Sequence, residues 1–257
     1  MTVSGYKVDK KGFVDLSDYA RALAVCLASK FKNSSVHAYH ITLFHFGVML
    51  GAIYFVSQGG LRNYFLASIL LLIKNVLDSV DGSLARLQNR PSRVGRFLDS
   101  NLDFVGNLLL FLAFRDLSLA ARLSAFLFFI LQGSIFNYYY ILLRQFNNGD
   151  KTSQIKEDGQ SVYSYDHPLV LKCLYIMYVV LYDWQDKLVD FVECKIIKKD
   201  RGSVEEKFLS YLSTGGLGFQ YLIIIAALLL QHTDYIVLWF FGMNIFVGVL
   251  LFYRAYR

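Results

Sequence analysis

The amino-acid sequence predicts an all-helical, polytopic membrane protein with about six transmembrane helices and an amphipathic helix on the membrane surface. Of the 257 residues, 55% are hydrophobic and only 18% are charged, whereas a soluble domain carries about a quarter charged residues. The apolar runs are long, and about 20 mostly apolar residues cross a bilayer as a helix. Only two prolines interrupt the chain.

Residues 1–36 are predicted to form a cytoplasmic segment that contains the surface helix. The first long apolar run begins only near His40, behind polar residues, so this segment does not resemble a signal peptide. Apolar side chains recur at helical spacing, at Leu16, Ala20, Leu23, Leu27 and Phe31. This spacing predicts a helix from Asp15 to Phe31, with Asp15 or Ser17 as its N-cap. The helix is too polar to span a bilayer, so we expect it along the membrane surface.

Residues 37–257 are predicted to form the transmembrane domain. Its six candidate spans are 38–57, 63–88, 95–114, 119–143, 208–231 and 235–253. The second would reach roughly 39 Å at 1.5 Å per residue, beyond the ~30 Å hydrocarbon core. We therefore expect its C-terminal end, with Asp78, Asp81 and Arg86, to project into the headgroup region.

Residues 145–207 interrupt this pattern as a predicted cytoplasmic or interfacial insertion. Its first half, NNGDKTSQIKEDGQS, is a polar loop. Its second half, from Pro168 to Cys194, is rich in Leu, Tyr and Val but is broken by acidic residues and Lys187. We expect an interfacial or partly buried helix there, with a seventh span as the alternative. The three cysteines, Cys26, Cys173 and Cys194, have no metal-like spacing and are interpreted as free thiols.

The basic residues predict the orientation. With the N-terminus inside, 22 lysines and arginines fall on the cytoplasmic side and three, Arg62, Arg115 and Arg122, on the other. This asymmetry places both termini and the aspartates of the second span in the cytoplasm. The net charge of +6 fits loops beside anionic lipid better than a nucleic-acid partner.

Four aspartates carry the clearest chemical signal. Asp78 and Asp81 are three residues apart, and Asp99 and Asp103 are four apart, so each pair shares one face of a helix. A short link with Asn89 and Pro91 as turn signals joins the two helices. The two carboxylate faces can therefore meet across an antiparallel helix pair.

Such a cluster needs compensating charge, because ionisable groups within spans are costly and usually mark function. Mg²⁺ and Mn²⁺ prefer carboxylate oxygens and often share their coordination with substrate phosphates. Four carboxylates suit two ions, and two-metal sites commonly promote displacement at phosphorus. Gly82, Ala85 and Gly95 would let a bulky group approach the backbone, and Arg86 could hold a phosphate. A structural ion-pair network or a proton path is the alternative interpretation.

The spacing D-x-x-D-G-x-x-A-R-x8-G-x3-D-x3-D resembles the signature of the CDP-alcohol phosphatidyltransferases, and all eight defining positions match. The resemblance implies that Asp78, Asp81 and Asp99 bind metal and that Asp103 is the general base and also touches a metal. It implies that the small residues and Arg86 line the CDP site. It also implies a homodimer with the site open to the cytoplasm.

The predicted reaction is therefore transfer of a phosphatidyl group from CDP-diacylglycerol to a small polar alcohol, with release of CMP. The two alternatives are transfer from a CDP-alcohol to diacylglycerol and, in a different class, a membrane transporter with intramembrane carboxylates. The expected cofactors are two Mg²⁺ or Mn²⁺ ions. The partners are the CDP-linked lipid donor, the alcohol acceptor and membrane lipids, and the acceptor is left open.

Other polar residues near the signature have simpler interpretations. Lys74 precedes Asp78 by one turn and is expected to be a counter-ion of the cluster, although contact with the acceptor is possible. For Arg93 and Arg96, a role in topology and a role in phosphate binding are equal alternatives. Arg144 is expected to reach the membrane surface, with binding of a phosphorylated acceptor as the alternative. His37, His40 and His45 are assigned to the interface, without a metal role. Gly215, Gly216 and Gly218 are expected to serve packing or a kink, since no Lys-Ser/Thr follows them.

Overall fold

The computed structural model describes residues 13–146, 159–160, 163–197 and 204–256, and these residues form helices and connections without a strand. Most of the polar loop predicted at 147–161 and most of the polar start of the chain therefore lie outside the described residues. The first helices are α1 (Arg21–Phe31), α2 (Ala38–Gln58), α3 (Leu61–Leu87), α4 (Arg93–Leu112) and α5 (Leu119–Phe146). The all-α prediction is confirmed for the described part of the chain.

The second half begins with the predicted insertion helix, which is present as α6 (Pro168–Tyr178), α7 (Trp184–Phe191) and two π-helical segments, η1 (Val179–Asp183) and η2 (Val192–Ile197). It continues with α8 (Glu206–Leu212), η3 (Ser213–Gly215), α9 (Leu217–Leu229), η4 (Thr233–Tyr235) and α10 (Ile236–Tyr256). All six predicted apolar stretches are thus helical, within a few residues of the expected bounds.

Three helices, at Ala38–Gln58, Leu119–Gln145 and Thr233–Tyr256, are long and apolar enough to cross a membrane. A fourth span results if Glu206–Gly215 and Leu217–Leu229, which meet at a bend of 42°, count as one. The structure thus supports three or four spans by length and composition. α3 and α4 are of spanning length but carry the charged residues of the signature.

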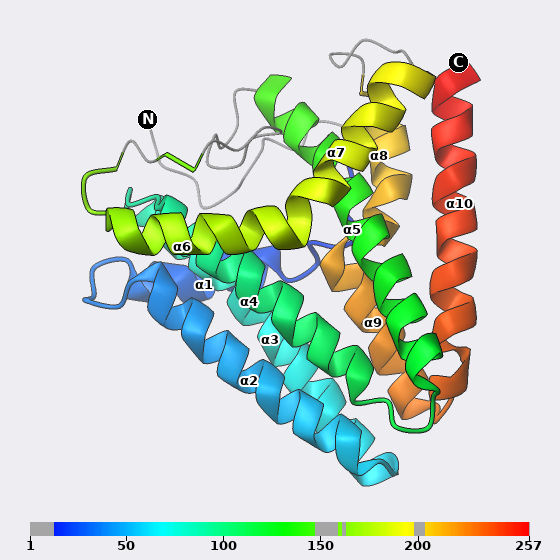
Figure 1. Cartoon of the computed structure of the whole chain (residues 1–257). Coiled ribbons are helices and arrows are strands. Elements are labelled where there is room, and N and C mark those ends of the chain that lie inside the picture. The colour runs from blue at the N-terminus through cyan, green and yellow to red at the C-terminus, as the bar shows by residue number, and fades with distance from the viewer. Residues whose placement is uncertain (1–12, 147–158, 161–162, 198–203, 257) are drawn as a thin grey trace.

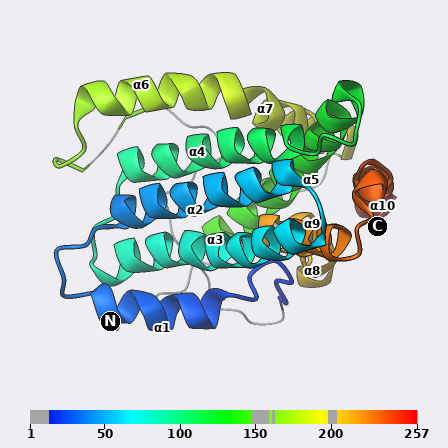
Figure 2. The same cartoon turned by 90° about the horizontal axis from the view of Figure 1, so that it is seen from below.

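The main core lies between the long helices. Buried side chains from α2, α3, α4, α5, α9 and α10 form one cluster that includes Leu71, Phe111 and Phe240. Figures 1 and 2 show α1 and α6 on opposite sides of the α2–α4 group, near the end where α3 stops and α4 begins. This end of the bundle is therefore enclosed from two sides by helices that run across it.

The surface helix begins later than predicted. Asp15 does not cap it, because Asp15 Oδ1 accepts hydrogen bonds from Ser17 N and Ser17 Oγ at 3.0 and 2.7 Å and holds a local turn instead. The face of α1 that packs against α3 carries Ala24 and Ala28, beside Val80 and Leu84. Leu16, Leu23 and Phe31 of the predicted apolar stripe are exposed.

The glycines around the start of α9 serve a kink and a close approach, as expected. Gly215 and Gly216 lie at the 42° bend between Glu206–Gly215 and Leu217–Leu229, and Gly218 lies in the first turn of α9. A Cβ atom on Gly218 would lie 2.0 Å from the carbonyl oxygen of Ser17, and one on Gly216 would lie 2.4 Å from the Ser17 side chain. Only glycine lets the segment before α1 pass this closely over the start of α9.

A buried ion pair joins the insertion to the last helix. Arg254 Nη2 of α10 lies 2.7 Å from Glu193 Oε1 of η2, and both side chains are at most 5% exposed. Tyr139 of α5 donates a hydrogen bond to Glu193 Oε2 at 2.5 Å, and the Arg254 guanidinium lies over the rings of Tyr139 and Phe208. Three distant segments of the chain are thus fixed to one another. The cysteines Cys26, Cys173 and Cys194 are exposed thiols that form no disulfide among the described residues, as predicted.

Candidate active site

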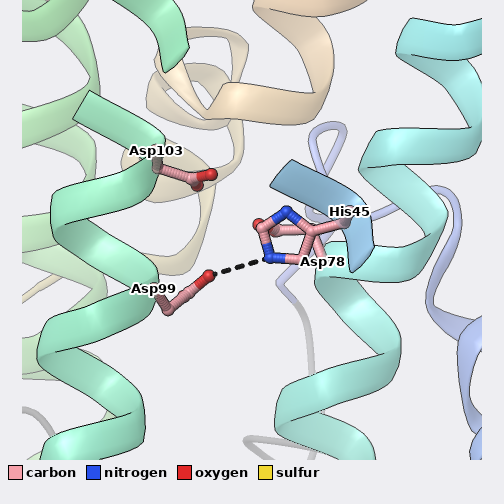
Figure 3. Close-up of side chains that lie close together, drawn as sticks. All are labelled: His45, Asp78, Asp99 and Asp103. Carbon is pink, nitrogen blue, oxygen red and sulfur yellow. Dashed lines mark hydrogen bonds and ion pairs between the residues drawn. The ribbon is translucent and has the colours of Figure 1, made fainter. Parts of the chain in front are cut away.

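Three of the four signature aspartates meet between α3 and α4. One ligand atom from each of Asp78, Asp99 and Asp103, together with one from His45 of α2, lies within 4.8 Å of every other. Figure 3 shows Asp99 and Asp103 projecting from α4 toward Asp78 and His45. The helical spacing of the aspartates therefore predicted their convergence correctly.

Asp81 lies beside this group rather than within it. Its side chain is buried, and Asp81 Oδ2 accepts a hydrogen bond from Thr42 Oγ1 at 2.7 Å. The same oxygen lies 3.4 Å from His45 Nε2. Asp81 is thus connected to the other aspartates through the imidazole of His45.

His45 is the site residue that the sequence interpretation missed. An interfacial location was expected, but the side chain is fully buried, and His45 Nε2 lies 3.3 Å from Asp99 Oδ1. Only a weak pattern in the sequence indicated that His45 belongs to the site. Thr42 and His45 are polar residues three apart on an otherwise apolar helix, so they share one face.

Lys74 is a counter-ion of the cluster, which confirms the preferred interpretation. It is 1% exposed, and its ammonium lies 3.0 Å from Asp78 Oδ1 and 2.7 Å from Asp103 Oδ1. Lys74 also lies over the ring of Tyr221, 5.3 Å from its centroid. Because the buried ammonium pairs with both carboxylates, it lowers the electrostatic free-energy cost of placing Asp78 and Asp103 close together.

The aspartates line a cavity of about 1230 Å³ that also contains Gly82, Ala85, Arg86 and Gly95. Arg86 Nη1 would lie 3.4 Å from a Cβ atom on Gly82, so the guanidinium lies against the bare backbone of α3. Gly95 N donates to the capping hydroxyl of Ser92 at 2.9 Å. All eight signature positions therefore face one space, which is larger than a usual small-ligand pocket of about 300–1,000 Å³.

A family model for CDP-alcohol phosphatidyltransferase matches residues 35–250 of this sequence, which is most of the chain. The chain belongs to the CDP-alcohol phosphatidyltransferase family. That family consists of enzymes that transfer a substituted phosphate group, so the transporter alternative is dropped. The family, together with the apolar helices, indicates an integral membrane protein.

This phosphatidyltransferase is also similar to a protein described as uncharacterized from Aquifex aeolicus (strain VF5). The two are 38% identical over 99 residues. The aligned part covers 38% of this chain and 48% of the Aquifex protein, so the match spans about half the length of that relative.

The insertion forms a wall of the phosphatidyltransferase cavity, which the sequence did not indicate. Asp166 accepts hydrogen bonds from Ser92 Oγ at 2.5 Å and from the backbone of Arg93 at 2.9 Å, at the N-terminus of α4. Further along, Tyr182 donates to the carbonyl oxygen of Ser100 at 3.0 Å. Both Asp166 and Tyr182 line the cavity. The insertion therefore holds the helix that carries Asp99 and Asp103.

The arginines around the cavity have distinct surroundings. Arg96 lines the cavity, with its guanidinium over the rings of Phe97 and Tyr178 at 5.1 and 5.3 Å. Arg144 also lines it but is 4% exposed, so it does not reach the surface as expected. Arg21 Nε lies 2.9 Å from Asp18 Oδ1. Burial alone would lower the pKa of Arg21, but the Asp18 carboxylate outweighs it and the pKa is raised, so the guanidinium stays charged.

Proposed function

We propose that this protein transfers a phosphatidyl group from CDP-diacylglycerol to a small polar alcohol and releases CMP. The observation that carries the proposal is the convergence of Asp78, Asp99 and Asp103 on a cavity lined by the remaining signature residues. A cavity of about 1230 Å³ suits a nucleotide-linked donor together with an acceptor. The reverse arrangement, with CDP on the alcohol and diacylglycerol as acceptor, is the second candidate.

The residues fit a site for divalent cations. The ligand atoms of His45, Asp78, Asp99 and Asp103 lie within 4.8 Å of one another, close to the ~4.2 Å between opposite ligands of an ion bound at 2.1 Å. The Lys74 ammonium contacts one oxygen each of Asp78 and Asp103. Asp78, Asp81, Asp99 and Asp103 would hold two Mg²⁺ or Mn²⁺ ions. When bound, such ions neutralise a pyrophosphate and make CMP a better leaving group.

The chain's own side chains have separate roles in this proposal. Asp103 accepts the proton of the acceptor hydroxyl as that hydroxyl attacks the phosphorus distal to cytidine. Gly82, Ala85 and Gly95 leave space for the donor against the backbone of α3 and α4, and Arg86 holds a phosphate. The wall formed by the insertion keeps α4, and with it Asp103, in position.

We further propose that α2, α3, α4, α5, α8–α9 and α10 all span the membrane, that α1 lies on its cytoplasmic surface and that both termini and the site face the cytoplasm. The excess of lysine and arginine on that side supports this orientation. We also propose a homodimer, with residues 37–257 as its catalytic transmembrane domain.

The exposed thiols provide a test of this orientation. Cys26 of α1, Cys173 of α6 and Cys194 of η2 are exposed and all lie on the proposed cytoplasmic side. We expect a membrane-impermeant maleimide to label the protein in inside-out vesicles, and to label it in right-side-out vesicles only after detergent is added. A variant with all three cysteines changed to serine is the control for background. Labelling in intact right-side-out vesicles would contradict the orientation.

The reaction itself is tested with purified protein and radiolabelled CDP-diacylglycerol, against a panel of polar alcohols. We expect one alcohol to give a new phospholipid and stoichiometric CMP. Chelation of divalent ions should abolish both products, and added Mg²⁺ or Mn²⁺ should restore them. Absence of CMP with every alcohol, followed by CMP release from a CDP-alcohol and diacylglycerol, would overturn the proposed donor and favour the reverse arrangement.

A further inference from the structure

An imidazole approaches the carboxylate cluster from within the protein. His45 is fully buried in α2, a helix apolar enough to span a membrane. His45 Nε2 lies 3.3 Å from Asp99 Oδ1 and 3.4 Å from Asp81 Oδ2. The cavity is lined by the aspartates and not by His45, so the ring contacts the cluster from the side opposite the substrate space.

The polar contacts of His45 are with the cluster. Its polar partners among the described residues are the two site carboxylates, and its other ring nitrogen, Nδ1, is buried without a hydrogen-bond partner there. Burial of a polar ring costs free energy unless its polar atoms are satisfied. Within the described residues, the imidazole therefore serves the carboxylate cluster. Thr42, one turn earlier, bonds to Asp81 of the same cluster.

We propose that His45 Nε2 is a ligand of one of the divalent ions, so that the site has a mixed nitrogen and oxygen donor set. This inference rests on the proposed function in that it requires the aspartates to bind metal. Carboxylate oxygens suit both Mg²⁺ and Mn²⁺, whereas imidazole nitrogen favours transition metals. The structure therefore assigns this enzyme a preference for Mn²⁺, or a related transition-metal ion, over Mg²⁺.

Charge and position agree with this assignment. A neutral imidazole adds a donor atom without adding to the negative charge of the four carboxylates. Because His45 contacts the cluster from the protein side, the coordination positions toward the cavity stay available for phosphate oxygens of the donor. The ligand atoms of His45, Asp78, Asp99 and Asp103 already lie within 4.8 Å of one another.

The test is pulsed electron paramagnetic resonance of Mn²⁺ bound to the purified full-length protein. Directly bound imidazole gives a ¹⁴N modulation that carboxylates and water do not give. We expect this modulation in the natural protein and its loss in His45→Gln, with Mn²⁺ affinity falling about tenfold or more and Mg²⁺ affinity changing much less. His40→Gln is the matched control, because His40 is an exposed histidine of the same helix.

The outcomes separate the two proposals. Mn²⁺ that binds without ¹⁴N modulation, or modulation that persists in His45→Gln, would overturn the role of His45 and leave the carboxylate site intact. Failure of the natural protein to bind Mn²⁺ or Mg²⁺ at all would contradict the proposed function. If His45→Gln does not fold, a variant in which His37, His40, His167 and His232 are all changed to glutamine decides the matter. Modulation must persist there, because His45 is the only histidine left.

Discussion

Asp103→Asn is expected to reduce the turnover of phosphatidyl transfer by roughly 10²–10⁴-fold, the usual contribution of a general base. Asparagine has nearly the same shape as aspartate but cannot accept the proton of the acceptor alcohol. Lys74 keeps its second carboxylate partner, Asp78, so the fold should survive the change. The measurement is CMP release by purified protein that inserts into membranes and elutes as the natural protein does.

Two companion variants make this result interpretable. Asp99→Asn should also abolish transfer, but with a larger loss of Mn²⁺ affinity than Asp103→Asn, because Asp103 is proposed as the base as well as a ligand. Asp116→Asn is the matched control, because Asp116 lies in the connection between α4 and α5 and contacts Tyr64 rather than the cluster. Near-normal activity of folded Asp103→Asn would rule out Asp103 as the base.

Lys74→Met is expected to destabilise the metal-free protein by about 3–5 kcal/mol, the usual effect of removing one partner from a buried ion pair. Asp78 and Asp103 would then lie together in a buried site without an ammonium between them. Saturating Mn²⁺ should recover part of the loss, because a ligand that binds only the folded state stabilises it. The measurement is thermal unfolding in detergent, with chelator and with Mn²⁺.

The double variant Lys74→Met with Asp103→Asn is the control for this experiment. It removes one charge of each sign, so its loss of stability should be smaller than the sum of the two single losses. If Lys74→Met unfolds at the temperature of the natural protein in the presence of chelator, the lysine does not stabilise the aspartates.

The signature aspartates were predictable because their arrangement is local. Residues three or four apart share a helix face, and a short link turns α4 back antiparallel to α3. Asp78 therefore faces Asp99 and Asp103 across the space between these helices, while α2 packs against both. The contact of Lys74 with Asp78 was predictable from the same rule, because Lys74 lies one helical turn before Asp78. The metal-binding and base roles assigned to these aspartates stay predictions.

The rest of the site depends on contacts between distant segments. Which face of α2 meets α3 decides whether His45 is buried in the cluster or exposed at the interface. Apart from Thr42 and His45, the middle of α2 is apolar on every side, so its sequence specifies that face only weakly. The bond from Tyr182 to Ser100 joins residues 82 positions apart. The start of α1 was misplaced for a related reason, because Leu16 N bonds to Ser213 Oγ and holds the preceding segment on the start of α9.

The Arg254–Glu193 pair has a consequence for biosynthesis. The insertion that supports α4 is itself fixed to α10, and a ribosome makes α10 after every residue of the signature. Until α10 is in place, Glu193 lacks its ion-pair partner Arg254, and the insertion lacks one of the contacts that fix its position. A nascent chain would therefore carry all four aspartates before it could hold them rigidly. Formation of the rigid site would then coincide with completion of membrane insertion.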